Sequence, residues 1–290
     1  MTSLGMVVRP HVPPEQLRDI ARVADESGLE QLWLWEDSFF ASGIAAAAAV
    51  LAATERLRVG IGIMPVPYRN VGLLAMEIAT LDRMFPGRFI AGVGHGNLKW
   101  MAQAGARAES PMTLLSEYVT ALRALLRGER LTVSGRYVHL DDVALEWPPV
   151  SAPPVLVGAT GQRSLRLSGE IADGSVLDAR YRPGDVRRIR ALIEEGRVDG
   201  GRTDPHETVV YLTASSGDDA DSRLAQERAT WGHAPDSGIG VAGDAARIAG
   251  EIGEFVAAGA NSVVIVPVED EPDLSGLARL IATEIRQSVR

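Results

Sequence analysis

VGIGIMPVPYRNVGLLAMEIATLDRMFPGRFIAGVGHGN, residues 59–97, is the stretch that decides the fold class of this chain. An apolar run at its start ends in a Gly- and Pro-rich turn, an apolar-periodic helix follows, and a second apolar run ends in a Gly-rich turn. The order strand, loop, helix, strand, loop is one unit of a parallel α/β fold. Both loops leave the C-terminal ends of their strands, where α/β proteins bind ligands. The stretch therefore predicts how the chain is built and at which end of the sheet its site lies.

Short apolar runs recur along the rest of the chain, with helical patterns between them. Most are continuously apolar, as expected for parallel strands that are covered on both faces. Eight strand–helix pairs predict a single (β/α)8 (TIM) barrel domain over residues 1–290. The predicted strands are Leu4–Val8, Leu32–Trp35, Arg58–Ile63, Arg88–Val93, Val155–Gly158, Gly174–Leu177, Thr208–Thr213 and Ser262–Val266.

Two segments interrupt this alternation. Arg130–Leu140 has two short β-like runs around Ser134 and Gly135, which predicts a β-hairpin inserted before the fifth strand. Asp218–Gly240 is polar and weakly patterned beyond its helix, so it is a candidate for a mobile lid near the C-terminal mouth of the barrel.

Composition excludes several classes of function. With 38 acidic and 29 basic residues the formal charge is −9, which argues against nucleic-acid binding. There are no cysteines, so disulfides, zinc–thiolate sites and thiol nucleophiles are excluded. The longest apolar run, Gly43–Ala53, is too short to span a bilayer and predicts a helix packed closely on the sheet. No signal peptide is recognised, and a cytoplasmic protein without membrane or nucleic-acid partners is expected.

The residues that follow the predicted strands should converge on one mouth of the barrel. Gly94–Asn97 (GHGN) has glycines without Cβ atoms against which a flat ligand can lie, although taken alone the motif favours a tight βα turn that needs positive φ. Thr160–Ser164 opens a helix directly after a strand, so its free N–H groups suit a phosphate, while an ordinary helix cap is the competing interpretation.

Acid–base candidates are few. Glu36 and Asp37 follow a very apolar strand, where a carboxylate with a raised pKa can transfer protons, or where one of them caps a helix or pairs with an arginine. His95 is the best placed of the five histidines. No group of His, Asp and Glu has metal-ligand spacing on one element, and no nucleophile motif is present. No metal site is therefore expected.

Three motifs carry a resemblance to a known family. They are ATLDRMFPGRFIAGVGHGN (79–97), PPVLVGATGQRSLRLSGEIADGSVL (153–177) and LLRGERLTVSGRYVHL (125–140). With these the chain resembles the luciferase-like monooxygenase superfamily, and within it the branch that uses the deazaflavin coenzyme F420. The resemblance implies a (β/α)8 barrel that binds a flavin or deazaflavin at its C-terminal mouth, an oxidoreductase activity on a small organic substrate, and a homodimer.

The resemblance also implies site residues. A non-prolyl cis peptide bond is expected at Gly62–Ile63, behind the cofactor ring, and Asp37, His95 or Glu36 is expected to handle protons or orient the substrate. The implied cofactor contacts are Asp37, Gly62, Ile63, Met64, Gly94, His95, Gly96 and Asn97 around the ring, and Ala159, Thr160, Gly161 and Gln162 at the phosphate.

One departure from the family pattern affects the expected chemistry. Several F420-dependent members have an Asp-His pair after the second strand, whereas this chain has Asp37-Ser38. An acidic residue that sugar-phosphate dehydrogenases of the group carry after the fourth strand is Asn97 here. Both changes weaken an assignment as an alcohol or sugar-phosphate dehydrogenase.

Three hypotheses remain open from the sequence. The first is an F420-dependent oxidoreductase that transfers a hydride, the second an FMN-dependent monooxygenase, and the third a cofactor-binding barrel without turnover. F420 differs from FMN by a long anionic tail, which favours the first hypothesis if basic residues lie at the rim. The candidates are Arg163, Arg166, Arg180 and Arg182.

Overall fold

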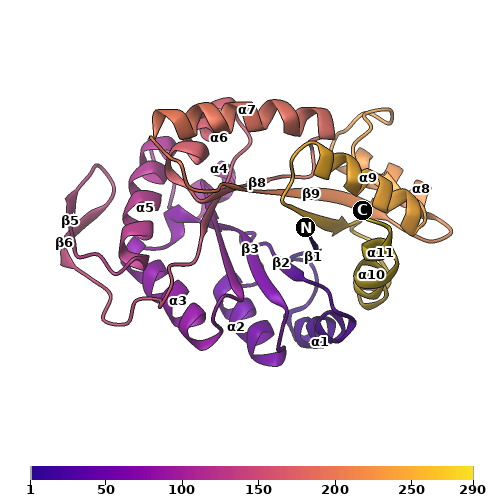
Figure 1. Ribbon diagram of the computed structural model, residues 1–290, viewed down its shortest axis with the longest axis horizontal. Helices are drawn as coiled ribbons and strands as arrows, with labels where there is room; N and C mark the ends of the chain where they lie inside the picture. The colour runs from indigo at the N-terminus through magenta and orange to yellow at the C-terminus, as the bar shows by residue number, and fades with distance from the viewer. Residues whose placement is uncertain (1, 290) are drawn as a thin grey trace.

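Eight parallel strands close into a barrel in the computed structural model, which describes residues 2–289 (Figure 1). The predicted (β/α)8 fold and each of the eight predicted strands are confirmed, with ends that differ by at most a few residues. In order around the barrel the strands are β1 (Ser3–Val8), β2 (Gln31–Leu34), β3 (Arg58–Pro65), β4 (Phe89–Gly94), β7 (Val155–Gly158), β8 (Gly174–Leu177), β9 (Glu207–Ser215) and β11 (Ser262–Pro267), which pairs again with β1.

Helices surround the barrel, and the chain marks their ends with capping residues (Figure 1). Asn70 accepts a hydrogen bond from the Gly72 N–H at the start of α3, and Gly28 ends α1 with a φ of 85°. The helices are η1 (Pro14–Gln16), α1 (Leu17–Ser27), α2 (Gly43–Ala53), η2 (Val66–Tyr68), α3 (Val71–Met84), α4 (Leu98–Gln103), α5 (Pro111–Leu126), α6 (Gln162–Ile171), α7 (Pro183–Asp199), α8 (Ala220–Thr230), α9 (Ala245–Ala257), α10 (Leu274–Leu280), the π-helical turn η3 (Ile281–Ile285) and α11 (Arg286–Ser288).

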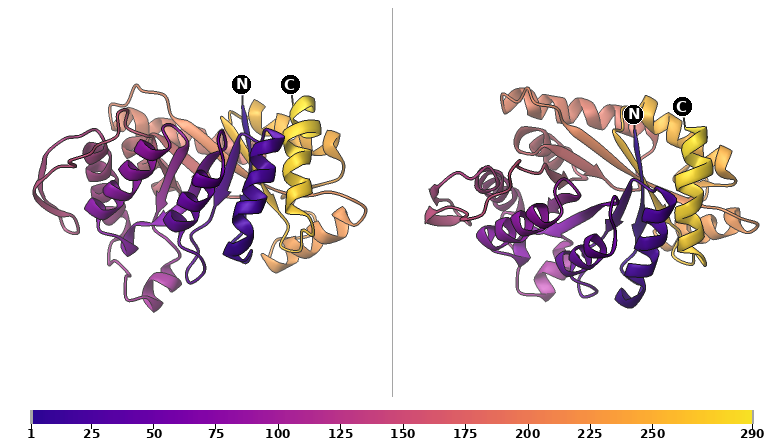
Figure 2. Two further views of the ribbon diagram at one scale, coloured as in Figure 1. Left: turned by 90° about the horizontal axis from the view of Figure 1, so that it is seen from below. Right: turned by 60° about the horizontal axis from the view of Figure 1, so that its bottom comes forward.

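The two interrupting segments fold differently from one another. The hairpin pairs β5 (Leu131–Ser134) with β6 (His139–Val143) outside α5, as predicted, and it reaches Val143 instead of Leu140 (Figure 1). The proposed lid, Asp218–Gly240, contains α8 and the loop that follows it. It ends just before the short strand β10 (Val241–Ala242), which pairs with β9 and was not predicted. Figure 2 shows α8 near the end of the barrel opposite to the two chain termini, which is the C-terminal mouth.

Two apolar layers hold the barrel together. The larger lies between the sheet and the helices, and the smaller fills the barrel interior. In the interior, the ring of Trp33 meets the edge of the Tyr211 ring at a centroid distance of 5.9 Å. Because Trp33, Tyr211 and their apolar neighbours fill the barrel interior, a ligand can bind at its C-terminal end.

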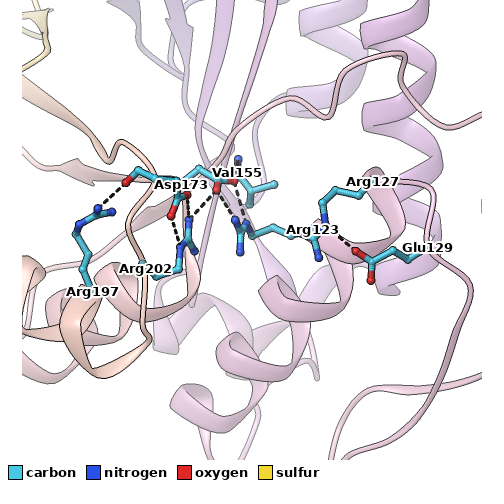
Figure 3. A network of polar contacts seen from close by, with 8 residues as sticks. Arg123, Arg127, Glu129, Val155, Asp173, Arg197 and Arg202 are labelled. Carbon is cyan, nitrogen blue, oxygen red and sulfur yellow. Dashed lines mark hydrogen bonds and ion pairs between the residues drawn. The ribbon is translucent and has the colours of Figure 1, made fainter.

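A polar network around Asp173 lies next to the start of β8, at the N-terminal end of the barrel (Figure 3). The Asp173 carboxylate accepts hydrogen bonds from Arg123 Nε at 3.0 Å, from Arg202 Nη2 at 3.0 Å and from the Val155 N–H at 3.0 Å. Asp173 thereby ties α5, β7 and the α7–β9 loop to the start of β8. The A-D-G motif that supported the family resemblance is thus a structural feature, remote from the mouth.

Within residues 2–289, no helix has the length and apolar character that crossing a bilayer requires.

Candidate functional site

Two adjoining cavities occupy the C-terminal mouth. The inner cavity has a volume of about 290 Å³ and the outer cavity one of about 390 Å³. The two share six lining residues, Trp35, Asp37, Gly62, Trp100, Asp178 and Tyr211. The inner cavity is further lined by Glu36, Ile63, Pro65, His95, Gly96, Asn97, Gly158, Ala159, Thr160, Ser164 and Val176. The outer cavity extends beneath α8 and its following loop to Arg9, Ala179, Arg180, Thr213, Leu224, Glu227, Arg228, Trp231, His233, Ile239 and Val266.

The wall of the inner cavity is built where β3 bulges. The peptide bond Gly62–Ile63 is cis, as the resemblance implied, and the pairing of β3 with β4 shifts at this point. The Tyr211 hydroxyl donates a hydrogen bond to the Gly62 carbonyl at 3.3 Å. A Cβ at position 62 would lie 1.9 Å from Tyr211 Oη, and one at position 158 would lie 2.6 Å from Ile63 Cγ2. Glycine at both positions therefore keeps this wall flat and the space in front of it open.

Met64 does not contribute to either cavity. Its side chain is fully buried in the layer between the sheet and the helices. The expected ring contact by Met64 is therefore wrong as a side-chain contact. The physical reason is strand alternation, because Ile63 faces the mouth and its neighbour faces the helices.

The two carboxylates after β2 have separate environments. Glu36 is 9% exposed and is held by Arg69, whose Nη1 and Nη2 lie 2.7 Å and 2.5 Å from its oxygens. It also accepts a hydrogen bond from the Gly43 N–H at the start of α2. Although Glu36 touches the inner cavity, these partners occupy its carboxylate, so the structure argues against Glu36 as an acid–base group.

Asp37 is the available carboxylate of the pair. Among residues 2–289 no hydrogen bond or ion pair to its side chain is present, and it lines both cavities. Burial raises the pKa of Asp37, and the positive charge of Arg9 opposes this shift. A half-buried carboxylate without a fixed partner is suited to accept a hydrogen bond or a proton from a ligand.

Ser38 stands where the family resemblance led us to expect a histidine. Its hydroxyl lies 2.5 Å from the hydroxyl of Tyr68 on η2, and the side chain is 9% exposed. A second non-prolyl cis bond, Ser38–Phe39, follows and was not anticipated. Ser38 lines neither cavity, so it does not replace the missing histidine.

The turn after β4 brings His95 to the inner cavity. Burial lowers the pKa of His95 and so favours the neutral imidazole. An interaction with the backbone of Pro111 partly offsets this shift. Its Nδ1 is buried and has no hydrogen-bond partner among the described residues. Gly96 has a φ of 69°, which favours glycine, and Asn97 caps α4 by accepting from the N–H groups of Lys99 and Trp100. Gly94 is buried at the end of β4 and does not line the cavity.

The far end of the inner cavity meets the start of α6. Ala159, Thr160 and Ser164 line it, whereas Gly161 and Gln162 lie just outside the lining. Ser164 Oγ accepts from the Gly161 N–H at 3.1 Å and donates to the Gly161 carbonyl at 2.9 Å. The hydroxyl of Ser164, the last residue of the Thr160–Ser164 segment at which a phosphate was expected, thus orders that turn.

The expected rim arginines do not form one group. Arg166 forms ion pairs with Glu195 and Asp199 on α7, away from the mouth. Arg182 pairs with Asp185, and Arg180 pairs with Asp178. Of these arginines, Arg180 alone lines one of the two cavities.

Asp178 lies at the mouth, as expected of a residue directly after a strand, whereas Tyr211 and Trp100 were missed in the sequence. Burial raises the pKa of Asp178, opposed by Arg180, and this carboxylate lies between the two cavities. Tyr211 could have been found from the alternation of β9, since Val209 and Tyr211 both face the barrel interior. Trp100 lies on α4, a short helix that no pattern predicted.

The proposed lid contributes a fixed wall in this structure. Arg228 on α8 donates hydrogen bonds to the carbonyls of Pro235, Ile239 and Gly240, which holds the loop against the helix. Glu227 accepts from Arg9 at 2.7 Å and from Trp231 Nε1 at 2.8 Å, which fastens α8 to the end of β1. Whether the segment opens stays a prediction.

Among the described residues, no group of three or more His, Cys, Asp and Glu side chains is arranged to hold a metal ion.

Comparisons with known proteins agree with this geometry. A 5,10-methylenetetrahydromethanopterin reductase of Methanolobus tindarius is 28% identical over 228 residues, which cover 78% of this chain and 69% of the relative. An F420-dependent glucose-6-phosphate dehydrogenase of Microbacterium testaceum is 28% identical over 229 residues, covering 74% and 68%.

Solved structures extend the likeness in fold. The coenzyme F420-dependent tetrahydromethanopterin reductase of Methanopyrus kandleri superposes with a TM-score of 0.86 at 22% identity, over 100% of this chain and 99% of that one. The oxygenating constituent of 3,6-diketocamphane monooxygenase of Pseudomonas putida, in complex with FMN, gives a TM-score of 0.79 at 17% identity over 100% and 99%.

The family profile described as luciferase-like monooxygenase matches residues 2–263, nearly the full length of the barrel. The chain belongs to the luciferase-like monooxygenase family.

Proposed function

We propose that the protein is an F420-dependent oxidoreductase that transfers a hydride between the deazaflavin and a small organic substrate. The observation that carries the proposal is the inner cavity, whose glycine-lined wall at Gly62 and Gly158 leaves room for a flat ring in front of Ile63. Two relatives that match most of the chain, the reductase and the glucose-6-phosphate dehydrogenase named above, belong to the same family, and the second is F420-dependent by name.

The residues present fit such a cofactor. The ring would lie along Ile63 and the Gly96 turn, and its phosphate would reach Thr160 and the N–H groups that open α6. F420, when bound, supplies the hydride chemistry, and the protein contributes orientation and electrostatics.

Proton handling falls to two groups of this chain. Asp37 carries a raised pKa and lacks a fixed partner, so it would hold or accept the proton of a substrate. Burial favours the neutral form of His95, and its imidazole lines the inner cavity, where it would hydrogen-bond to the cofactor ring or to the substrate.

An FMN-dependent monooxygenase is the second candidate. The observation in its favour is the likeness of the whole barrel to an FMN-bound monooxygenase at a TM-score of 0.79. The two cofactors share a ring shape and a phosphate, so the inner cavity suits both, and the rim arginines give F420 little advantage because Arg166 and Arg182 are engaged elsewhere.

The test is a pair of fluorescence titrations of the purified protein with oxidised F420 and with FMN. Micromolar or tighter binding of F420 with weak binding of FMN supports the proposal. The reverse result assigns the protein to the flavin monooxygenases. Binding of neither cofactor refutes both candidates, and binding of F420 without turnover of any substrate supports a barrel without turnover.

We also propose that the protein is a homodimer through α2 and α3. The outer face of α3 exposes Leu73, Met76 and Met84 at 48%, 58% and 64%, and Phe39 and Phe40 before α2 are 69% and 60% exposed. Exposed large apolar side chains of this kind are typical of a protein–protein interface. A second copy is its proposed occupant because the family resemblance implies a dimer.

A further inference from the structure

The outer cavity is the space that a cofactor in the inner cavity would leave for a substrate. The six shared lining residues join the two cavities directly, and about 390 Å³ is enough for a small organic molecule. The inference rests on the proposed F420 function, since the outer cavity is assigned to the substrate because the cofactor would occupy the inner one.

Each arginine that lines the outer cavity is already engaged. Arg9 donates to Glu227 at 2.7 Å and to the Pro267 carbonyl at 3.2 Å, with its side chain only 6% exposed. Arg180 pairs with Asp178 at 2.7 Å. Arg228 is held by three loop carbonyls. Arg180 contacts Asp178 through Nε, so a phosphate or carboxylate on a ligand could reach its Nη groups, but this side chain is 57% exposed and water weakens such a contact.

The carboxylates of the cavity are less fully engaged. Asp37 has no hydrogen-bond or ion-pair partner within the part of the chain that the structure describes, and it lies on the boundary of both cavities. Asp178, on the same boundary, is paired with Arg180, whose side chain is 57% exposed and so screened by water. Of the two charged side chains that line both cavities, Asp37 is therefore the one left to bind a ligand group.

Aromatic side chains supply the apolar walls. Trp35 and Tyr211 lie with ring centroids 5.7 Å apart, and Trp100 and Trp231 line the cavity from α4 and from the loop after α8. The faces of such rings attract flat neutral groups and cations, and they repel anions. The ring faces and the Asp37 carboxylate thus both favour a cation over an anion.

We propose that the outer cavity takes a flat, neutral or cationic organic substrate that presents a hydrogen-bond donor or a positive charge to Asp37, and that it rejects phosphorylated and carboxylate substrates. The substrate class then differs from that of the glucose-6-phosphate dehydrogenase relative, whose named substrate is a phosphate ester.

The test uses three probes of one shape and different charge: 1-methylnicotinamide, nicotinamide and nicotinate, with glucose 6-phosphate as a phosphorylated probe. Binding is measured by calorimetry on protein saturated with oxidised F420 and on the cofactor-free protein. We expect the cation to bind at least about ten-fold more tightly than nicotinate, with the neutral amide between them and no binding of glucose 6-phosphate. Equal or tighter binding of either anion, or no binding of any probe, overturns the inference.

A variant pair assigns the preference to Asp37. Asp37→Asn should reduce the ratio of cation to anion affinity by about ten-fold. Asp236 is an exposed residue of the loop after α8, and its side chain lines neither cavity. Asp236→Asn removes the same charge and should leave the ratio of cation to anion affinity unchanged. Retention of the preference in Asp37→Asn overturns the inference. Failure of F420 to bind refutes the proposed function instead, and the titration of the cofactor-free protein still decides the charge preference of the cavity.

Discussion

Gly158→Ala is expected to weaken cofactor binding by filling the inner cavity from behind. The new Cβ would lie 2.6 Å from Ile63 Cγ2, whereas carbon atoms normally approach to about 3.5–4.0 Å. The Ile63 methyl must therefore move by roughly 1 Å, and Ile63 is stiff at χ1 because it is β-branched. The movement that relieves the contact carries Ile63 into the space of the proposed ring. Overpacking of this kind costs about 1–2 kcal/mol, which corresponds to a loss of F420 affinity of roughly 5–30-fold.

The assay compares F420 titrations of the wild type, Gly158→Ala and a matched control. Gly253→Ala is that control, because it adds the same methyl group on α9 where no atom lies within 4 Å. Urea unfolding without cofactor is measured in parallel to show that the variant folds. An F420 affinity of Gly158→Ala within two-fold of the control, in a folded protein, would refute the reasoning that Ile63 borders the ring site.

Three further predictions concern stability and assembly. Asp173→Ala removes the acceptor of Arg123 and two other donors, and should lower the free energy of unfolding by about 2 kcal/mol in urea titrations; a change below about 0.5 kcal/mol would contradict the role of the network. Burial first, and nearby arginines second, lower the pKa of His206 from 6.5 to about 4, so the unfolded chain takes up this proton before the folded one. Stability should therefore fall as the pH drops from about 6.5 towards 4, and unfolding midpoints of His206→Gln should show a shallower fall over that range; an identical pH slope in both proteins would exclude His206 as the cause. Met76→Glu places a charge on the proposed dimer face and should shift the mass found by light scattering from dimer to monomer, whereas Val198→Glu, on a still more exposed site of α7, should not; a wild-type monomer would remove the dimer proposal.

Local pattern was sufficient for the architecture. The strands of the barrel are continuous apolar runs, and their number, spacing and intervening helices follow from residues that are near in sequence. The hairpin followed from two β-like runs around a Ser-Gly turn. The ends of elements were less certain, because β3 runs through its bulge to Pro65 and β6 gains residues from pairing with β5.

The candidate site was predicted only in part. A cavity lies at the strand ends, where the site was predicted, and the cis bond at Gly62–Ile63 was confirmed. Glu36 and Asp37 were indistinguishable as neighbours in the sequence. The structure separates them, because Arg69 lies 33 residues further along the chain and reaches only Glu36.

The sequence by itself determined that this protein is a parallel α/β barrel of the luciferase-like type, with its site at the C-terminal mouth, because periodicity and turn chemistry are local properties of the chain. Tertiary structure alone decided which polar groups of that mouth are free. Arg9 is held by Glu227 over a separation of 218 residues, and Arg180, Arg228 and Glu36 are likewise engaged by partners that the fold brings to them. The charge that a cavity presents is what remains after its residues have paired with one another, and pairing depends on distances in space that no spacing along the chain specifies.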